Sequence, residues 1–384
     1  MEQRRKNLTQ LFIPICLETL LYMLSGMVDT LMLSSVNDQA VGAVGTANTY
    51  IGIFIIMFSV ISSGMVAVMT QNIGAGRPGV AYQARQLGLT FNAVLGIIVS
   101  LILTFGAGAI LAGVGVADAL MQPARTYLQI VGGFCILNAL IPICSSYLRA
   151  FGFSKEPLYA SIIGNVINFC LNAFFLFVLH KGVAGVATAT VISRIINLVI
   201  VVLLGAVLVK AKQHPERESN RAVMGQIIRI GLPSACETAI YNVSMTLVIR
   251  FLNQMDAQGL NVTARSYTMQ ITNFSYCVGA ALAQANAIMT GWHIGAKEYD
   301  ACDRGTKKAA VIGVIVAVIL ETVFTLCSGW IMQLFSKDPQ MVSLVGKLLA
   351  IDIVLEIGRV TNLVYGQALK TSGDAVFPVV MGVC

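Results

Sequence analysis

The residues best suited to chemistry in this sequence are two carboxylates inside one apolar run. The run Pro14–Leu33, "PICLETLLYMLSGMVDTLML", contains Glu18 and Asp29. The two acids are 11 residues apart, about three helical turns, so a helix places both on one face. Tyr22 and Ser25 fall between them and complete a polar stripe. Because a carboxylate is costly in lipid, we expect this stripe to face a cavity or the protein interior.

A second polar stripe follows in a later apolar run, where Ser161, Asn165, Asn168 and Asn172 share one helical face. We expect it to face the same cavity as Asp29, and interhelical hydrogen bonding is the alternative. A carboxylate with amide and hydroxyl oxygens is a ligand set suited to Na⁺. In an apolar cavity the same carboxylate could carry a proton instead.

The composition predicts the frame that positions these stripes. The chain has 384 residues, of which 57% are hydrophobic and 11% charged, and its apolar runs of about 20 residues are separated by short polar segments. This indicates an all-α polytopic membrane protein. The expected spans are 10–34, 47–72, 86–113, 122–147, 157–179, 185–209, 226–253, 262–290, 304–332 and 340–368, with the start of an eleventh near 375.

The charge distribution predicts the orientation. With the N-terminus in the cytoplasm, 17 of the 25 Lys and Arg residues fall on the inside and 6 on the outside, with two within spans. We therefore expect a multi-pass cell membrane protein with a cytoplasmic N-terminus. No compact basic patch indicates nucleic acid as a partner. The nine cysteines show no CxxC spacing, so they predict packing rather than a metal site or disulfides, and we expect no cofactor.

An internal repeat divides the chain into a first lobe (1–209), a cytoplasmic linker (210–225) and a second lobe (226–384). The string "IGAG" at 73–76 recurs as "IGAK" at 294–297, an offset of 221. "LRAFGFSKEP" at 148–157 recurs at the same offset as "LKTSGDAVFP". Six spans per copy give both lobes the same orientation, the parallel arrangement of many transporters. At an offset of 219, Pro14, Glu18, Thr19, Tyr22 and Ser25 recur as Pro233, Glu237, Thr238, Tyr241 and Ser244.

The two copies differ in two respects. The position matching Asp29 holds Val248 in the second copy, so chemistry that needs this acid belongs to the first lobe. The second copy also stops about two spans early. We expect 12 spans in full, with about 10.5 present here, and interpret the chain as a fragment truncated at its C-terminus.

These strings resemble the multidrug and toxic compound extrusion (MATE) family. The resemblance covers essentially the whole chain and rests on Pro14–Leu33, "TQNIGAG" at 70–76, the repeated "LRAFG....P" string and "GVAGVATATVISR" at 182–194. It implies a V-shaped pair of six-helix lobes. It also implies an antiporter that exports small, often cationic and amphipathic compounds in exchange for Na⁺ or H⁺. We expect it to act as a monomer and not as an enzyme.

The resemblance also implies site residues. The coupling cluster of several family members matches Asp29, Asn168, Asn172 and Thr190, a possible Na⁺ site, although one branch has an Asp at the position of Asn172. Other members use acids of spans seven and ten, and Glu237 and Glu356 each lie about one turn from those positions. The residues expected with less support to line the substrate cavity are Glu18, Tyr22, Ser25, Asn165, Glu237, Tyr241 and Glu356.

Two arginines within spans have structural interpretations. Arg359 is three residues after Glu356, so the two could form an ion pair, with a functional acid as the alternative. Arg194 is expected to satisfy carbonyls or an acid near a helix end, with a direct role in transport as the alternative.

Two other functions remain open. A lipid-linked oligosaccharide flippase of a related family shares the fold, but its cleft should be broadly cationic, whereas the cavity-facing charges placed here are mostly acidic. A passive channel or a membrane enzyme is the third possibility. No TVGYG, HExxH or GxSxG string supports it.

Overall fold

The computed structural model of the chain describes residues 6–35, 38–113, 116, 118–210, 214–255, 260–333 and 338–383, and every regular element in these ranges is a helix. The predicted all-α fold is therefore confirmed. The elements are α1 (Leu8–Ser34), α2 (Asp38–Gly74), α3 (Pro78–Gly113), α4 (Asp118–Gly133), α5 (Ile136–Ala150), α6 (Lys155–Ala173), the π-helical turn η1 (Phe174–Val178), α7 (Gly182–Leu208), α8 (Asn220–Met255), α9 (Leu260–Gly295), α10 (Tyr299–Leu326), α11 (Ser328–Met332), α12 (Pro339–Ser372) and α13 (Val376–Val383).

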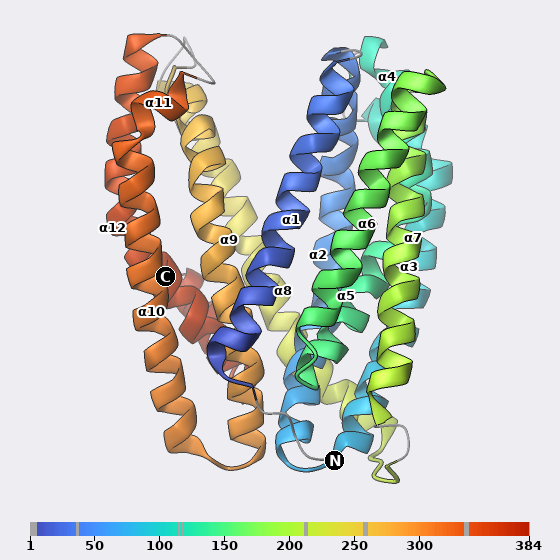
Figure 1. Ribbon diagram of the computed structural model, residues 1–384, viewed down its shortest axis with the longest axis vertical. Coiled ribbons are helices and arrows are strands. Elements are labelled where there is room, and N and C mark those ends of the chain that lie inside the picture. Colours follow the sequence, from blue (N-terminus) through green and yellow to red (C-terminus); the bar gives the residue numbers. More distant parts are fainter. Residues whose placement is uncertain are drawn as a thin grey trace.

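The helices form two lobes. In Figure 1, α1 to α7 stand on one side and α9 to α12 on the other, with α8 passing between them. The two sides are farther apart near α4 and α11 than at the opposite end, which we call the closed end. This is the expected V-shaped arrangement.

The turns of the two lobes show that the repeat extends to backbone geometry. Gly152 and Gly373, at an offset of 221, both have positive φ, 84° and 108°. The amide of Gly152 donates to the carbonyl of Arg149 at 2.9 Å, and the amide of Gly373 donates to Lys370 at 3.2 Å. A left-handed residue that closes a helix in this way is usually glycine, because a Cβ is unfavourable there. The repeat predicted from the sequence is thus confirmed at these turns.

One helix differs between the copies. The first lobe has a bend of 43° between α4 and α5, whereas α12 continues through the matching segment. The pair Gly132 and Gly133 precedes the break, and residues 221 positions later are Ile353 and Val354. Adjacent glycines weaken a helix and are a common cause of kinks, which accounts for the difference.

The membrane-spanning character is clear for most of the fold. Six helices within the described ranges are long and apolar enough to cross a membrane: α1, α2, α3, α6 with η1, α7 and α10. The bent pair α4–α5 meets the same criteria if it is counted as one span, which gives a seventh. Helices α8, α9 and α12 are at least 34 residues long but more polar, so the total number of spans stays a prediction. Large exposed apolar side chains such as Phe105, which is 83% exposed, fit an outer surface in lipid.

The two lobes meet at the closed end through a core that includes residues of α1, α2, α8 and α9. Trp292 of α9 is buried there, and its Nε1 donates to the carbonyl of Ala150 in the first lobe at 2.9 Å. Helices α2 and α9 approach so closely that a Cβ on Gly74 would collide with the backbone of Trp292, and one on Gly295 with the backbone of Gln71. We call Gly74 and Gly295, again 221 residues apart, the glycine seam.

Candidate functional site

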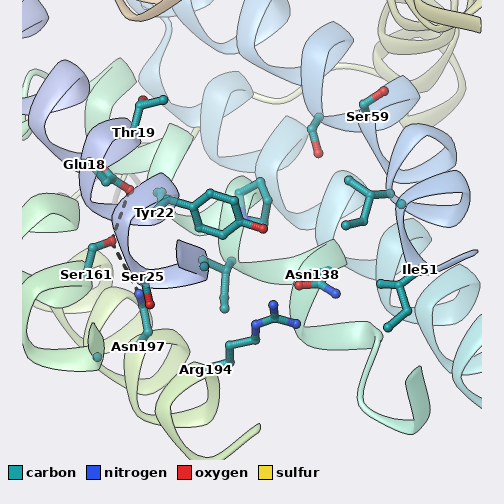
Figure 2. A pocket seen from close by; sticks show the side chains of 18 of the residues that line it. Glu18, Thr19, Tyr22, Ser25, Ile51, Ser59, Asn138, Ser161, Arg194 and Asn197 are labelled. Atoms are coloured by element: carbon teal, nitrogen blue, oxygen red, sulfur yellow. Dashed lines mark hydrogen bonds between the residues drawn. The ribbon is translucent and has the colours of Figure 1, made fainter. Parts of the chain in front are cut away.

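A cavity of about 1000 Å³ lies between the lobes. Its wall comes mainly from α1, α2, α5, α6 and α7 of the first lobe, with contributions from α8, α9 and α12 of the second. Figure 2 shows how Tyr22, Asn138 and Arg194 point into it. Of the predicted site residues, the lining includes Glu18, Tyr22, Ser25, Asp29, Asn165, Asn168 and Thr190.

Asp29 forms the centre of a polar cluster on the first-lobe wall. Asn172 donates from Nδ2 to Asp29 Oδ1 at 2.6 Å and to Asn168 Oδ1 at 3.2 Å. Positions 168 and 172 are one helical turn apart on α6, which lies against α1, so the stripe predicted from the sequence does face Asp29. Thr190 of α7 lines the same cavity and donates its hydroxyl to Val186.

The cluster has oxygen atoms free to accept a cation. Asn172 is fully buried behind the cavity wall, and its Oδ1 has no hydrogen-bond partner among the described residues. Asp29 receives an amide hydrogen bond but forms no ion pair within 4.0 Å with a described residue. Carboxylate, amide and hydroxyl oxygens together fit a hard monovalent cation such as Na⁺.

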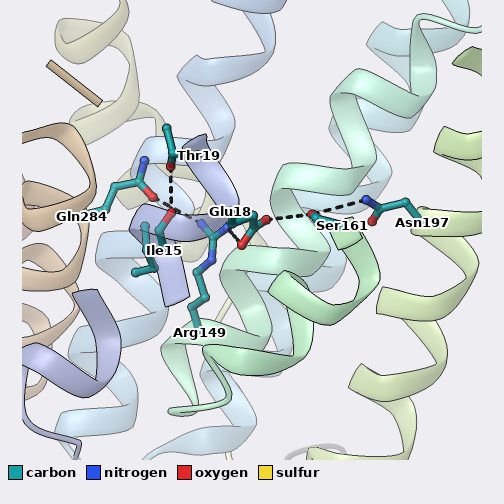
Figure 3. A network of polar contacts seen from close by, with 7 residues as sticks. All are labelled: Ile15, Glu18, Thr19, Arg149, Ser161, Asn197 and Gln284. Carbon is teal, nitrogen blue, oxygen red and sulfur yellow. Dashed lines mark hydrogen bonds and ion pairs between the residues drawn. The ribbon is translucent and has the colours of Figure 1, made fainter. Parts of the chain in front are cut away.

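Glu18 lies in a different environment from Asp29. Arg149 of α5 donates from Nη2 to Glu18 Oε2 at 2.6 Å, and both side chains are 14% exposed. Ser161 also donates to Glu18, at 3.4 Å (Figure 3). Arg149 donates its other terminal nitrogen to Gln284 Oε1 of the second lobe at 3.2 Å. Glu18 is therefore half of an ion pair at a junction between the lobes, with no charge left uncompensated.

The second lobe repeats this ion pair. Glu237 lies 2.7 Å from Lys370, and these residues match Glu18 and Arg149 at offsets of 219 and 221. Lys370 lines the cavity, whereas neither Glu237 nor Tyr241 is among the lining residues. The shared motif thus encodes one acid–base pair in each lobe.

The expectation of a mostly acidic cavity is wrong. The charged lining residues are two acids, Glu18 and Asp29, and three bases, Arg149, Arg194 and Lys370. The sequence assigned Arg149 and Lys370 to loops because they lie at the ends of apolar runs. Helix packing instead turns both side chains inward onto carboxylates.

Glu356 lies outside the cavity in a cluster of acids that sequence reasoning did not identify in full. Arg359 donates to Glu356 at 2.7 Å, the expected ion pair, and to Asp352 at 3.1 Å. Glu321 of α10 joins them, and ligand atoms of the three acids lie within 4.8 Å of one another. Both carboxylate oxygens of Glu321 are buried without a hydrogen-bond partner among the described residues. The signal for Glu321 and Asp352 was their position as acids within apolar runs.

Comparisons with known proteins agree with this geometry. The family model MatE matches the chain twice, at residues 14–174 and 233–384. The chain belongs to the multidrug and toxic compound extrusion (MATE) family. The two matches fall on the two copies of the repeat, and MATE proteins are transporters rather than enzymes.

Individual relatives and solved MATE structures support the same assignment. The chain is 33% identical to the uncharacterized transporter YisQ of Bacillus subtilis (strain 168), over 96% of this chain and 82% of that protein. It is 21% identical to the probable multidrug resistance protein NorM of Thermotoga maritima, over 98% and 82%. A crystal structure of MATE in the bent conformation superposes with a TM-score of 0.88 at 16% identity, covering 98% of this chain and 84% of that one.

Proposed function

We propose that the chain is a secondary active exporter that expels amphipathic cationic compounds in exchange for Na⁺ or H⁺. The observation that carries this proposal is Asp29, an acid without an ion-pair partner that opens into the cavity between two lobes. A coupling cation at Asp29 and the cationic group of a substrate would compete for the same carboxylate. We place the protein in the cell membrane as a monomer with its N-terminus in the cytoplasm.

Competition at one carboxylate is sufficient for exchange. A cation bound by Asp29, Asn168, Asn172 and Thr190 draws α1, α6 and α7 together, which stabilises one arrangement of the first lobe. A substrate that displaces the cation removes this preference, because a ligand shifts a conformational equilibrium only through its different affinities for the two states. Val248 at the matching position of the second lobe keeps this chemistry in the first lobe.

The flippase alternative has less support. Two of the three bases in the cavity are neutralised by carboxylates, Arg149 by Glu18 and Lys370 by Glu237. The lining is therefore not the broadly cationic surface that a lipid diphosphate requires.

The test is the variant Asp29→Asn of the transporter expressed in cells. We expect ethidium efflux from cells to fall to background while the amount of protein in the membrane is unchanged. Asp303→Asn is the matched control, because Asp303 is exposed and, among the described residues, pairs only with Lys307 in the same helix. Efflux by the Asp29 variant at the control rate would refute the role of Asp29. Proteoliposomes with either a Na⁺ or a pH gradient then identify the coupling ion.

A further inference from the structure

Arg194 is the one charged residue of the cavity lining whose side chain forms no hydrogen bond or ion pair within the part of the chain that the structure describes. It extends from α7 into the cavity, near Asn138 (Figure 2). Its guanidinium forms no ion pair within 4.0 Å with a described residue. Asp29 is close enough to interact with it electrostatically but does not pair with it.

The other two basic residues of the cavity lining are each neutralised by a carboxylate. Arg149 is paired with Glu18, and Lys370 with Glu237. Outside the cavity, Arg359 forms ion pairs with the carboxylates of Asp352 and Glu356. A guanidinium is costly to remove from water unless its charge and its hydrogen bonds are compensated. Arg194 is half-buried and lines the cavity, so its guanidinium is open to a partner that enters from outside the chain.

The chemistry of arginine specifies that partner. Its planar group presents two parallel N–H donors that match an oxyanion, such as a carboxylate, better than any neutral group. Asp29, which forms no ion pair with a described residue, lines the same cavity, so one ligand can contact both side chains. The wall thus offers a negative and a positive charge at neighbouring positions.

We propose that Arg194 binds the carboxylate of an amphoteric substrate while the cationic group of the same molecule lies at Asp29. The cavity then binds zwitterionic amphiphiles more tightly than simple organic cations, which remain substrates. This inference rests on the proposed export function and specifies its substrate class. The competition at Asp29 that drives exchange is retained, because the substrate still carries a cation.

A matched pair of dyes tests the proposal. Rhodamine 110 carries a free carboxylate, and rhodamine 123 is its methyl ester with the same cationic ring system. Binding to the purified protein in detergent is measured by fluorescence anisotropy. We expect the acid to bind about tenfold more tightly than the ester, the effect of one charge-assisted bidentate contact.

The variants separate recognition from folding. In Arg194→Gln the preference for the acid should disappear while the affinity for the ester stays within about twofold, since only the contact with the carboxylate is lost. Arg194→Lys keeps the charge without the planar fork and should retain part of the preference. Arg125→Gln, which removes an exposed arginine outside the cavity lining, is the control and should keep the full preference.

Equal binding of the two dyes, tighter binding of the ester, or no binding of either overturns the proposal. So does an Arg194→Gln variant that loses both affinities equally. Transport of rhodamine 123 in proteoliposomes is measured alongside. Efficient transport of the ester without any preference for the acid refutes the inference about Arg194 but leaves the export function standing.

Discussion

The ion pair between Glu18 and Arg149 makes a quantitative prediction about stability. An exposed ion pair contributes about 0–1 kcal/mol, and breaking a fully buried one costs about 3–5 kcal/mol. This pair is short, 2.6 Å, and both side chains are 14% exposed beside a cavity, so it falls between these limits. We expect Glu18→Gln to lower the free energy of unfolding by about 2 kcal/mol. Arg149→Gln should cost slightly more, because it also loses the contact with Gln284 of the second lobe.

A double-mutant cycle isolates the interaction itself. The double variant should be less destabilised than the sum of the single variants, giving a coupling energy of about 1–2 kcal/mol. The assay is reversible unfolding in mixed micelles by titration with SDS, followed by tryptophan fluorescence. Trp292 is a suitable probe because it is buried where the lobes meet.

The control cycle uses Asp303 and Lys307, an i,i+4 pair whose side chains are 57% and 64% exposed. Its coupling energy should be about 0.3–0.5 kcal/mol. A Glu18–Arg149 coupling no larger than that of the control would refute the reasoning, since burial would then add nothing to the pair.

The remaining predictions concern packing and the second lobe. Gly295→Ala should destabilise the protein by about 1–3 kcal/mol because the new Cβ collides with the backbone of α2, whereas Gly305→Ala, with open space around it, should be neutral or stabilising in the same SDS titration. Arg359→Met should cost about 3–5 kcal/mol because it leaves Glu356 and Asp352 buried without their cation. Glu321→Gln should leave stability unchanged or raise it, because it reduces the repulsion among three acids. The measurement is thermal unfolding without Na⁺, and a large loss of stability would show that the charge of Glu321 is compensated.

The helices and part of the candidate coupling site could be predicted from the sequence alone. Apolar runs of about 20 residues predicted the helices, and strings 221 positions apart predicted a repeat. The structure shows that the turns at Gly152 and Gly373 in the two copies are equivalent. The 4-3-4 spacing along α6 placed Asn168 and Asn172 on one face, and that face does lie against Asp29. Helical periodicity determines such faces locally, which is why they could be read before the fold was known.

Pairings between distant helices could not be read in this way. Arg149 and Glu18 are separated by 131 positions, and their contact depends on how α5 and α1 are rotated about their axes. The same applies to Glu321, which reaches Asp352 and Glu356 only through the packing of α10 on α12. The isolation of Arg194 is also a property of the assembled cavity, because it depends on where all the acids lie.

The glycine seam has a consequence for the mechanics of the transporter. At Gly74 and Gly295 the backbones of α2 and α9 are in direct contact, and no side chain lies between them. At these two positions, therefore, a rotamer change cannot separate the two helices. The seam opens only when the backbones of α2 and α9 move apart, and that movement involves both lobes at once.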